Sequence, residues 1–213
     1  MTDASNRFLH DRRAKMLALS VFERARNAGI PPRYMRIVKE HVKPILKDER
    51  IVEKIYIRPL SFKQTPFIII DGGSGHERKL IGYALLFRFI ACSMSGQYRD
   101  FSELSQVFTR FKFSRDEVGR EEVAKELKQM GALFISEFRP VLKDYSDAGV
   151  YFDEIFEYRG NYQKPTILSF NVPLSEEQLN DAVTYGRHFC AFSKCDEISD
   201  TERELQQIYR IKL

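Results

Sequence analysis

Three short runs of apolar residues, each about the length of one strand, divide the chain into alternating segments. The runs cover 67–70, 132–135 and 166–170, are rich in β-branched and aromatic side chains, and are each followed at once by polar residues. Continuous apolar runs of this length are typical of strands that are buried on both faces of a sheet. The pattern therefore predicts three central strands.

Around these runs, apolar residues recur with the spacing of amphipathic helices. Helices are predicted over about 8–27, 34–48, 80–94, 116–130 and 147–158. Weaker signals predict a short strand or an extended lead-in at 51–57, a short strand at 98–101, and a C-terminal helix that finishes in a strand. Because strands that alternate with helices form parallel sheets, we expect an α/β fold whose ligands bind at the carboxyl ends of the strands.

Composition places the chain among soluble globular proteins. Its 213 residues are 43% hydrophobic and 30% charged, with a formal net charge of +4. No apolar run approaches the roughly 18 residues of a membrane span, and the N-terminus lacks the apolar stretch of a signal peptide. The unframed Cys92, Cys190 and Cys195 favour a reducing cytoplasm. His188 with the last two is spaced unlike a zinc site, so we expect no metal.

A glycine-rich turn follows the first apolar run and precedes a helical pattern. Strand, glycine turn and helix form the geometry of a phosphate-binding loop, in which backbone N–H groups point at an anion. A nucleotide-binding P-loop reads G-x-x-x-x-G-K-S/T. The segment aligned with it is Gly72, Gly73, Ser74, Gly75, His76, Glu77, Arg78 and Lys79.

The last three positions of this loop carry the wrong chemistry for ATP and magnesium. Glu77 replaces a glycine with a carboxylate, which costs on the order of 4 kcal/mol at about 4 Å from a phosphate charge. Arg78 is bulkier and differently hydrated than lysine, and Lys79 cannot ligate Mg²⁺. We therefore expect ATP and magnesium binding to be weak or absent. The alternative is that the glycines serve only a tight turn and bind no anion.

The order of four segments resembles the DnaC helicase-loader family and its transposition relative IstB, within the AAA+ ATPases. The segments are AGIPPRY, FIIIDGGSGHERK, GALFISEF and PTILSFN, over about residues 25–180. The resemblance implies a three-layer α/β sandwich with a central parallel sheet and P-loop NTPase topology. It also implies a helical N-terminal extension (1–50) and an AAA+-like core (51–213). The short C-terminal tail leaves little room for the helical lid of many AAA+ proteins, so we expect the lid to be absent or reduced.

The same resemblance assigns roles to residues outside the loop. Ser136 stands where the family has its metal-binding acid, Glu137 in the slot of the water-activating carboxylate, Asn171 in that of the sensor and Arg159 in that of an inter-subunit arginine. Both magnesium contacts, at Lys79 and Ser136, are missing, and we expect ATP hydrolysis to be lost. The alternatives are that Glu137 only pairs with Arg78 or Lys79, that Asn171 caps a turn and that Arg159 is a surface residue.

The resemblance implies a DNA replication protein that binds a replicative helicase, single-stranded DNA, or both, and that is encoded by a mobile element. Without nucleotide at a subunit boundary, we expect a monomer or a dimer. One alternative is an active AAA+ ATPase with a divergent P-loop. Another is an IstB-like DNA-binding helper, because basic residues interleaved with aromatic ones can follow a phosphate backbone. The residues of this candidate patch are Arg110, Lys112, Arg115 and Arg120. The alternative is that they form an ordinary solvent-exposed helix face with no ligand.

Overall fold

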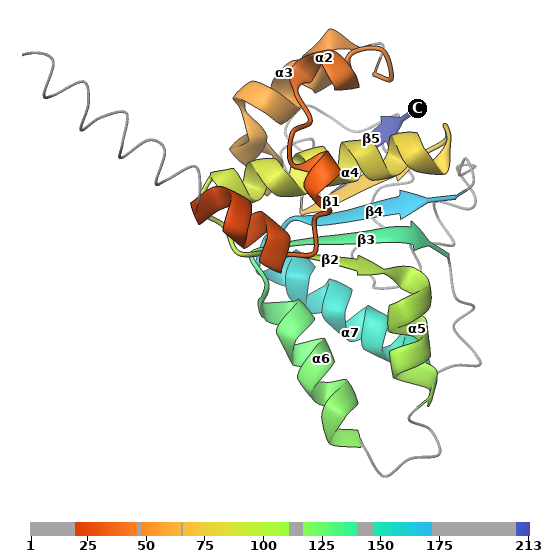
Figure 1. The fold of residues 1–213 in the computed structure, drawn as a ribbon. Helices are drawn as coiled ribbons and strands as arrows, with labels where there is room; N and C mark the ends of the chain where they lie inside the picture. The colour runs from red at the N-terminus through yellow and green to blue at the C-terminus, as the bar shows by residue number, and fades with distance from the viewer. Residues whose placement is uncertain (1–19, 47, 65, 111–116, 140–146, 172–207) are drawn as a thin grey trace, which may run out of the picture.

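A five-stranded parallel sheet forms the centre of the protein in the computed structural model (Figure 1). The strand order is β2-β3-β4-β1-β5. This arrangement confirms the predicted α/β class with a central parallel sheet. The residues that the structure describes are 20–46, 48–64, 66–110, 117–139, 147–171 and 208–213.

The three apolar runs become the three inner strands, as predicted. They are β1 (Phe67–Asp71), β3 (Ala132–Phe138) and β4 (Thr166–Phe170). The edges are β2 (Gly96–Asp100) and β5 (Ile208–Lys212), and both strands were also expected from the sequence. All strands run in the same direction, so their carboxyl ends meet along one edge of the sheet.

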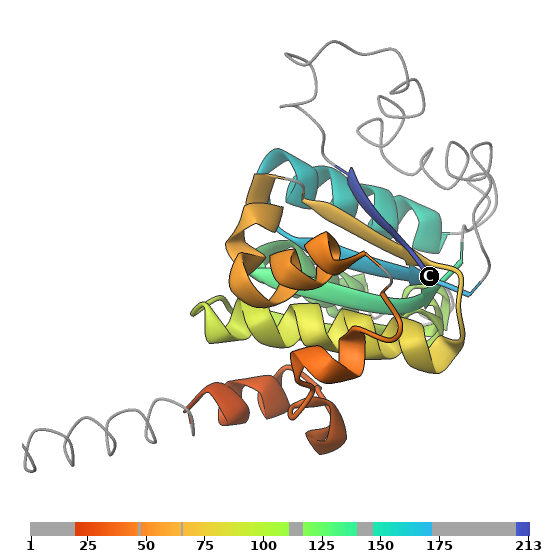
Figure 2. The same cartoon turned by 90° about the horizontal axis from the view of Figure 1, so that it is seen from above.

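Helices cover both faces of the sheet and complete a three-layer sandwich (Figures 1 and 2). One layer holds the helical segment 20–27, η1 (Pro32–Tyr34), α2 (Lys39–Val42), α3 (Glu49–Ile57), η2 (Pro59–Gln64) and α4 (Gly75–Ala91). The other layer holds α5 (Phe101–Arg110), α6 (Glu117–Gln129) and α7 (Asp147–Asn161).

Two hydrophobic clusters, one on each face, hold the layers together. Alternate residues of β1 enter different clusters because successive side chains of a strand point to opposite faces. Ile68 and Ile70 pack with α4 and the N-terminal layer, and Phe67 and Ile69 pack with α5, α6 and α7. Full burial of such a side chain stabilises the fold by about 1.5–3 kcal/mol.

The expected strand or extended lead-in at 51–57 is wrong, because this segment lies in the helix α3. Alternating apolar residues favoured a strand there, but Val52 and Ile55, three positions apart, are the two that are fully buried. The Asp48 carboxylate accepts a hydrogen bond from the Arg50 N–H at 2.8 Å and caps the helix. The helix expected at 34–48 is also shorter: η1 ends at Tyr34, and the described residues after it form only α2 before α3 begins.

Several expectations concern residues outside the described part of the chain. They are the start of the first helix (1–19), the reduced lid and the His188–Cys195 spacing (within 172–207), and the helix preceding β5. Among the described residues, no helix is both long enough and apolar enough to cross a membrane.

Gly82 allows α4 to approach the sheet closely, and its replacement by alanine is expected to destabilise the protein by about 2 kcal/mol. A Cβ at this position would overlap the ring of Phe134 in β3. Helix propensity alone would give the opposite sign, a gain of about 1 kcal/mol. Urea unfolding measures the change, and Phe134→Leu should recover part of the loss in the double variant. An unchanged or raised midpoint for Gly82→Ala would contradict this close packing.

Candidate functional site

The glycine loop lies at the carboxyl end of β1, between the neighbouring strands β4 and β5. Gly72 and Gly73 have φ values of 80° and 56°, which side chains other than glycine rarely adopt. Leu213, which follows β5, donates its N–H to the Asp71 carbonyl at 2.9 Å. A Cβ on Gly72 would lie 2.7 Å from the Leu213 carbonyl oxygen. Both the turn and the close approach of Leu213 therefore require glycine at this point.

The helix after the loop is capped by its own side chains. The Glu77 carboxylate accepts a hydrogen bond from the Ser74 N–H at 2.6 Å, and the Ser74 hydroxyl accepts one from the Glu77 N–H at 3.2 Å. This is a capping box. Hydrogen bonds from the Ser74 backbone and side chain lower the pKa of Glu77, so its carboxylate is charged at neutral pH. Two N–H groups that could face an anion are thus already occupied.

Arg78 turns back into the loop instead of pointing outward. Its Nη1 donates to the carbonyl oxygens of Gly72 at 3.0 Å and Gly73 at 2.8 Å, and its Nη2 lies 3.3 Å from the nearer carboxylate oxygen of Glu137. The Arg78 side chain is only 6% exposed. The cation aligned with the P-loop lysine therefore binds oxygen atoms of the protein itself.

Glu137 is the partner of this buried cation, as one of the two sequence-based interpretations held. It follows Ser136 on β3, where the register with β4 shifts, and its φ is 54°. Its N–H donates to the Ser169 hydroxyl at 3.1 Å. Left-handed backbone costs a non-glycine residue roughly 1–2 kcal/mol, so the contacts of Glu137 hold it in place against strain.

Ser136 belongs to a hydrogen-bond network with the neighbouring edge strand. Its hydroxyl donates to the Asp100 carboxylate at 3.1 Å and lies 2.9 Å from the Tyr98 hydroxyl. Burial raises the pKa of Asp100, but hydrogen bonds from Ser102 and Ser136 and the nearby charge of Lys79 outweigh it and leave the pKa lowered. The positive charge of Lys79 therefore lies near the Asp100 carboxylate.

An ion pair that joins β1 and β5 was not predicted from the sequence. Asp71 is fully buried, and Arg210 donates to its two carboxylate oxygens at 3.0 Å and 2.6 Å. The acid after the first apolar run was a visible signal for Asp71. Nothing local pointed to Arg210, which lies 139 positions later. This bidentate pair fixes the edge strand beside the loop.

The AGIPPRY segment lies against the same region. The Tyr34 ring stacks on Tyr83 of α4 at 4.5 Å between centroids, and its hydroxyl lies 3.4 Å from Nδ1 of His76 in the loop helix. The Arg33 guanidinium covers the Tyr34 ring at 4.8 Å. The ring contacts of Tyr34 therefore join this segment to α4.

Arg159 is neither on the surface nor available to a neighbouring subunit, which corrects both interpretations. Its side chain is fully buried and donates to the carbonyl oxygens of Leu127, Met130 and Pro165 and to the Thr166 hydroxyl, all at 2.7–2.8 Å. Thr166 begins β4, so Arg159 lies at the amino end of the sheet, away from the glycine loop. Burial lowers the pKa of Arg159 to about 9, which leaves it charged at neutral pH.

The remaining candidates do not gather at one place. Asn171 is exposed directly after β4, at the carboxyl edge that also holds the glycine loop and Glu137. Arg120 is buried on α6 with its guanidinium 5.9 Å from the Tyr151 ring centroid, so it packs on its own domain. Lys112 and Arg115 are outside the described part of the chain, and the side chain of Arg110 is not described.

The site as a whole is a closed set of internal contacts around a loop shaped for an anion. The Glu77 carboxylate binds the Ser74 N–H, and the Arg78 guanidinium binds the carbonyl oxygens of Gly72 and Gly73. Within the described ranges, no group of three or more histidine, cysteine, aspartate or glutamate side chains could hold a metal ion. An incoming triphosphate would have to displace Glu77 and Arg78 together.

Comparison with known proteins identifies the fold. No protein-family model matches the chain, and no curated protein is significantly similar in sequence. A crystal structure of DnaI superposes with a TM-score of 0.53 at 17% identity and covers 85% of this chain and 93% of its own. AMPPCP-bound DnaA from Aquifex aeolicus and a DNA replication initiation factor each give 0.51 at 14% identity.

The last two superpositions include 78% of this chain but only 46% of the DnaA chain and 45% of the initiation factor. At such low identities the similarity establishes the architecture alone. That architecture is the one predicted, a parallel sheet between helices as in AAA+ P-loop NTPases.

Proposed function

We propose that this protein is a helicase-loader-like DNA replication protein that has lost ATP hydrolysis and acts by binding a replicative helicase, single-stranded DNA, or both. The observation that carries the proposal is the position of Arg78, whose guanidinium is bound to Gly72, Gly73 and Glu137. A phosphate-binding loop works by leaving its donors free for the ligand. Here the protein's own side chains bind two of those donors, the N–H groups of Ser74 and Glu77, and its own oxygen atoms bind the Arg78 cation.

The replaced magnesium contacts support the same conclusion. Magnesium neutralises charge between the β- and γ-phosphates during phosphoryl transfer, and it is held by a hydroxyl and a carboxylate. In this chain those slots hold Lys79 and Ser136, and the Ser136 hydroxyl is engaged with Asp100 and Tyr98. A scaffold of this kind keeps its surfaces for partners while its nucleotide chemistry is gone.

The replication role is supported by the order of the sequence motifs and by the structural neighbours, which are DnaI, DnaA and a replication initiation factor. We propose that residues 1–50 form the partner-binding extension and 51–213 the AAA+-like core. Because nucleotide would not join subunits, we propose a monomer or a dimer in solution, and light scattering measures which.

The loss of nucleotide chemistry is tested by titrating the protein with ATP, with and without magnesium. We expect no saturable magnesium-dependent binding and no turnover, because an incoming phosphate meets the Glu77 carboxylate and the internally bound Arg78. Isothermal calorimetry and phosphate release measure the two quantities. Micromolar magnesium-ATP binding, with turnover that Glu137→Gln abolishes, would establish the active-ATPase alternative instead.

Partner binding is tested separately with a purified replicative helicase. We expect co-elution in size-exclusion chromatography that is unchanged when ATP is added or omitted, since the loop is closed by internal contacts. Absence of co-elution at micromolar concentrations of both proteins would contradict the helicase-binding role. An association that appears only with magnesium-ATP would contradict nucleotide independence.

A further inference from the structure

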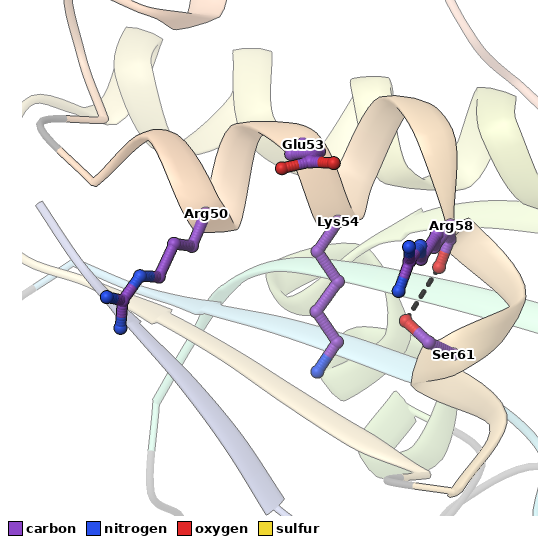
Figure 3. Close-up of a pocket in the computed structure, with 5 residues that line it drawn as sticks. All are labelled: Arg50, Glu53, Lys54, Arg58 and Ser61. Atoms are coloured by element: carbon purple, nitrogen blue, oxygen red, sulfur yellow. Dashed lines mark hydrogen bonds between the residues drawn. The ribbon is translucent and has the colours of Figure 1, made fainter.

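A second concave surface lies between α3 and η2, next to β5. It is at the opposite edge of the sheet from β2. It is an open pocket of about 420 Å³, shown in Figure 3. Three of its five lining residues are basic and one is acidic. The lining residues are Arg50, Glu53, Lys54, Arg58 and Ser61.

The three basic residues form an evenly spaced row, here called the α3 cation row (Arg50, Lys54 and Arg58). They stand four positions apart: Arg50 and Lys54 extend from α3, and Arg58 directly follows its last residue (Figure 3). With a helical rise of 1.5 Å per residue, Arg50 and Lys54 are about 6 Å apart along the axis. Arg50 and Arg58 are exposed, and neither forms an ion pair with any residue in the described part of the chain.

The central member of the row is held in place by aromatic side chains. Lys54 Nζ lies 4.0 Å from the Tyr209 ring centroid and 4.6 Å from that of Phe62. These cation–π contacts restrict a side chain that would otherwise lose rotamer freedom when it binds a ligand. Burial lowers the pKa of Lys54. The row is therefore partly preorganised for an anion.

Positive charge is concentrated in the layer that holds this row. Residues 20–64 contain 11 lysines and arginines against five aspartates and glutamates, an excess of six positive charges, whereas the whole chain carries +4. The other residues together are therefore slightly acidic. Such asymmetry is typical of a face that meets a polyanion.

We propose that the α3 cation row binds successive phosphates of a nucleic-acid backbone. The inference rests on the proposed function in one respect, since it assigns a surface to the nucleic-acid contact. Planar guanidinium groups bind phosphate in a bidentate manner, and evenly repeated cations match an evenly repeated anion. The exposed Ile57 and Leu60 flank Arg58 and offer apolar contact to sugar or base. Basic residues at 110–120 are then not the principal contact.

Fluorescence anisotropy with labelled oligo(dT), and with a labelled duplex of the same length, tests the row. In the double variant Arg50→Gln, Arg58→Gln we expect affinity for the bound form to fall about tenfold or more. The slope of log K against log salt should lose roughly 0.7 per removed contact for a single strand and 0.9 for a duplex. Glu53→Gln should act in the opposite direction and tighten binding, because it removes the single carboxylate of the pocket.

The control is Lys125→Gln, which removes one exposed cation from α6 on the opposite face of the sheet. Affinity that drops equally per charge in the control and in the row variant would overturn the inference. So would a loss confined to Lys112→Gln, Arg115→Gln, or wild-type protein that binds neither probe. Helicase co-elution of the same row variant separates the two proposals: if it persists, the proposed function stands whatever the anisotropy gives. A row variant that loses helicase and retains DNA would assign the row to a protein partner and overturn the inference.

Discussion

Replacing Arg159 with methionine is expected to destabilise the protein by about 3–5 kcal/mol, the largest effect of any substitution considered for this chain. The guanidinium joins three elements: it donates to two carbonyl oxygens at the end of α6, to the Pro165 carbonyl and to the Thr166 hydroxyl that begins β4. Methionine fills similar space and cannot donate. Each buried acceptor left without a donor costs about 1–3 kcal/mol, partly offset because the desolvated charge is also removed.

The matched control is Lys164→Met. Lys164 is half-buried and also donates to a carbonyl oxygen of α6, that of Gln129 at 2.9 Å, but this hydrogen bond is exposed to solvent. Water can replace this donor, so we expect a loss below about 1 kcal/mol. Urea midpoints measure both variants. Similar small losses for both would contradict a structural role of Arg159, and normal stability with altered subunit assembly would restore its interpretation as an inter-subunit arginine.

The strands of this fold were predictable because burial on both faces leaves a signal in the sequence. Phe67–Ile70, 132–135 and 166–170 are nearly continuous apolar runs, and only strands covered by helices on both sides need them. The strand predicted at 51–57 was wrong because this segment is partly exposed, and its apolar residues fit a helix as well as a strand. In α3 the alternating Ile51, Ile55 and Ile57 also fit a helix, and the capping Asp48 that decides between them precedes the alternation.

The loop's altered chemistry was predictable residue by residue, and Glu137 was predictable as one possible partner of Arg78, but the contacts of Arg78 with the Gly72 and Gly73 carbonyl groups were not. Glu77, Arg78 and Lys79 could be compared with a P-loop pattern directly, since the positions are consecutive. The oxygen atoms that bind the Arg78 guanidinium are placed by the turn at Gly72 and by β3. The spacing of residues in the sequence does not specify these positions. The same limit hid the partnership of Asp71 with Arg210.

Arg159 shows the limit most clearly. Its neighbours in the sequence are polar or small, as they would be for a surface residue, yet it is fully buried. The carbonyl groups that surround it come from the end of one helix and the start of one strand. Backbone acceptors have no sequence signature, so a cation that caps them can be recognised only in three dimensions.

Arg78→Ala is expected to destabilise the protein by about 2–3 kcal/mol. The substitution removes the donor to the Gly72 and Gly73 carbonyl oxygens and leaves the Glu137 carboxylate, 27% exposed, without its cation. The partial exposure of Glu137 keeps the loss below that of a fully buried ion pair. Lys79→Ala, at the next position, is the control, because Lys79 forms no hydrogen bond or ion pair with the described residues, and its loss should be within about 0.5 kcal/mol.

A double-mutant cycle with Glu137→Ala separates the ion pair from the loop contacts. If the internal pair fills the site, Arg78→Ala and Glu137→Ala should be coupled by about 1 kcal/mol in urea unfolding without any ligand, and magnesium-ATP should leave the coupling unchanged. The measurement also distinguishes the two views of the loop. In an ATP-binding protein Arg78 would act on phosphate, so its loss would reduce nucleotide binding with little effect on the ligand-free fold. Additive stabilities without nucleotide, together with coupling that appears when ATP is added, would therefore refute an internally closed loop.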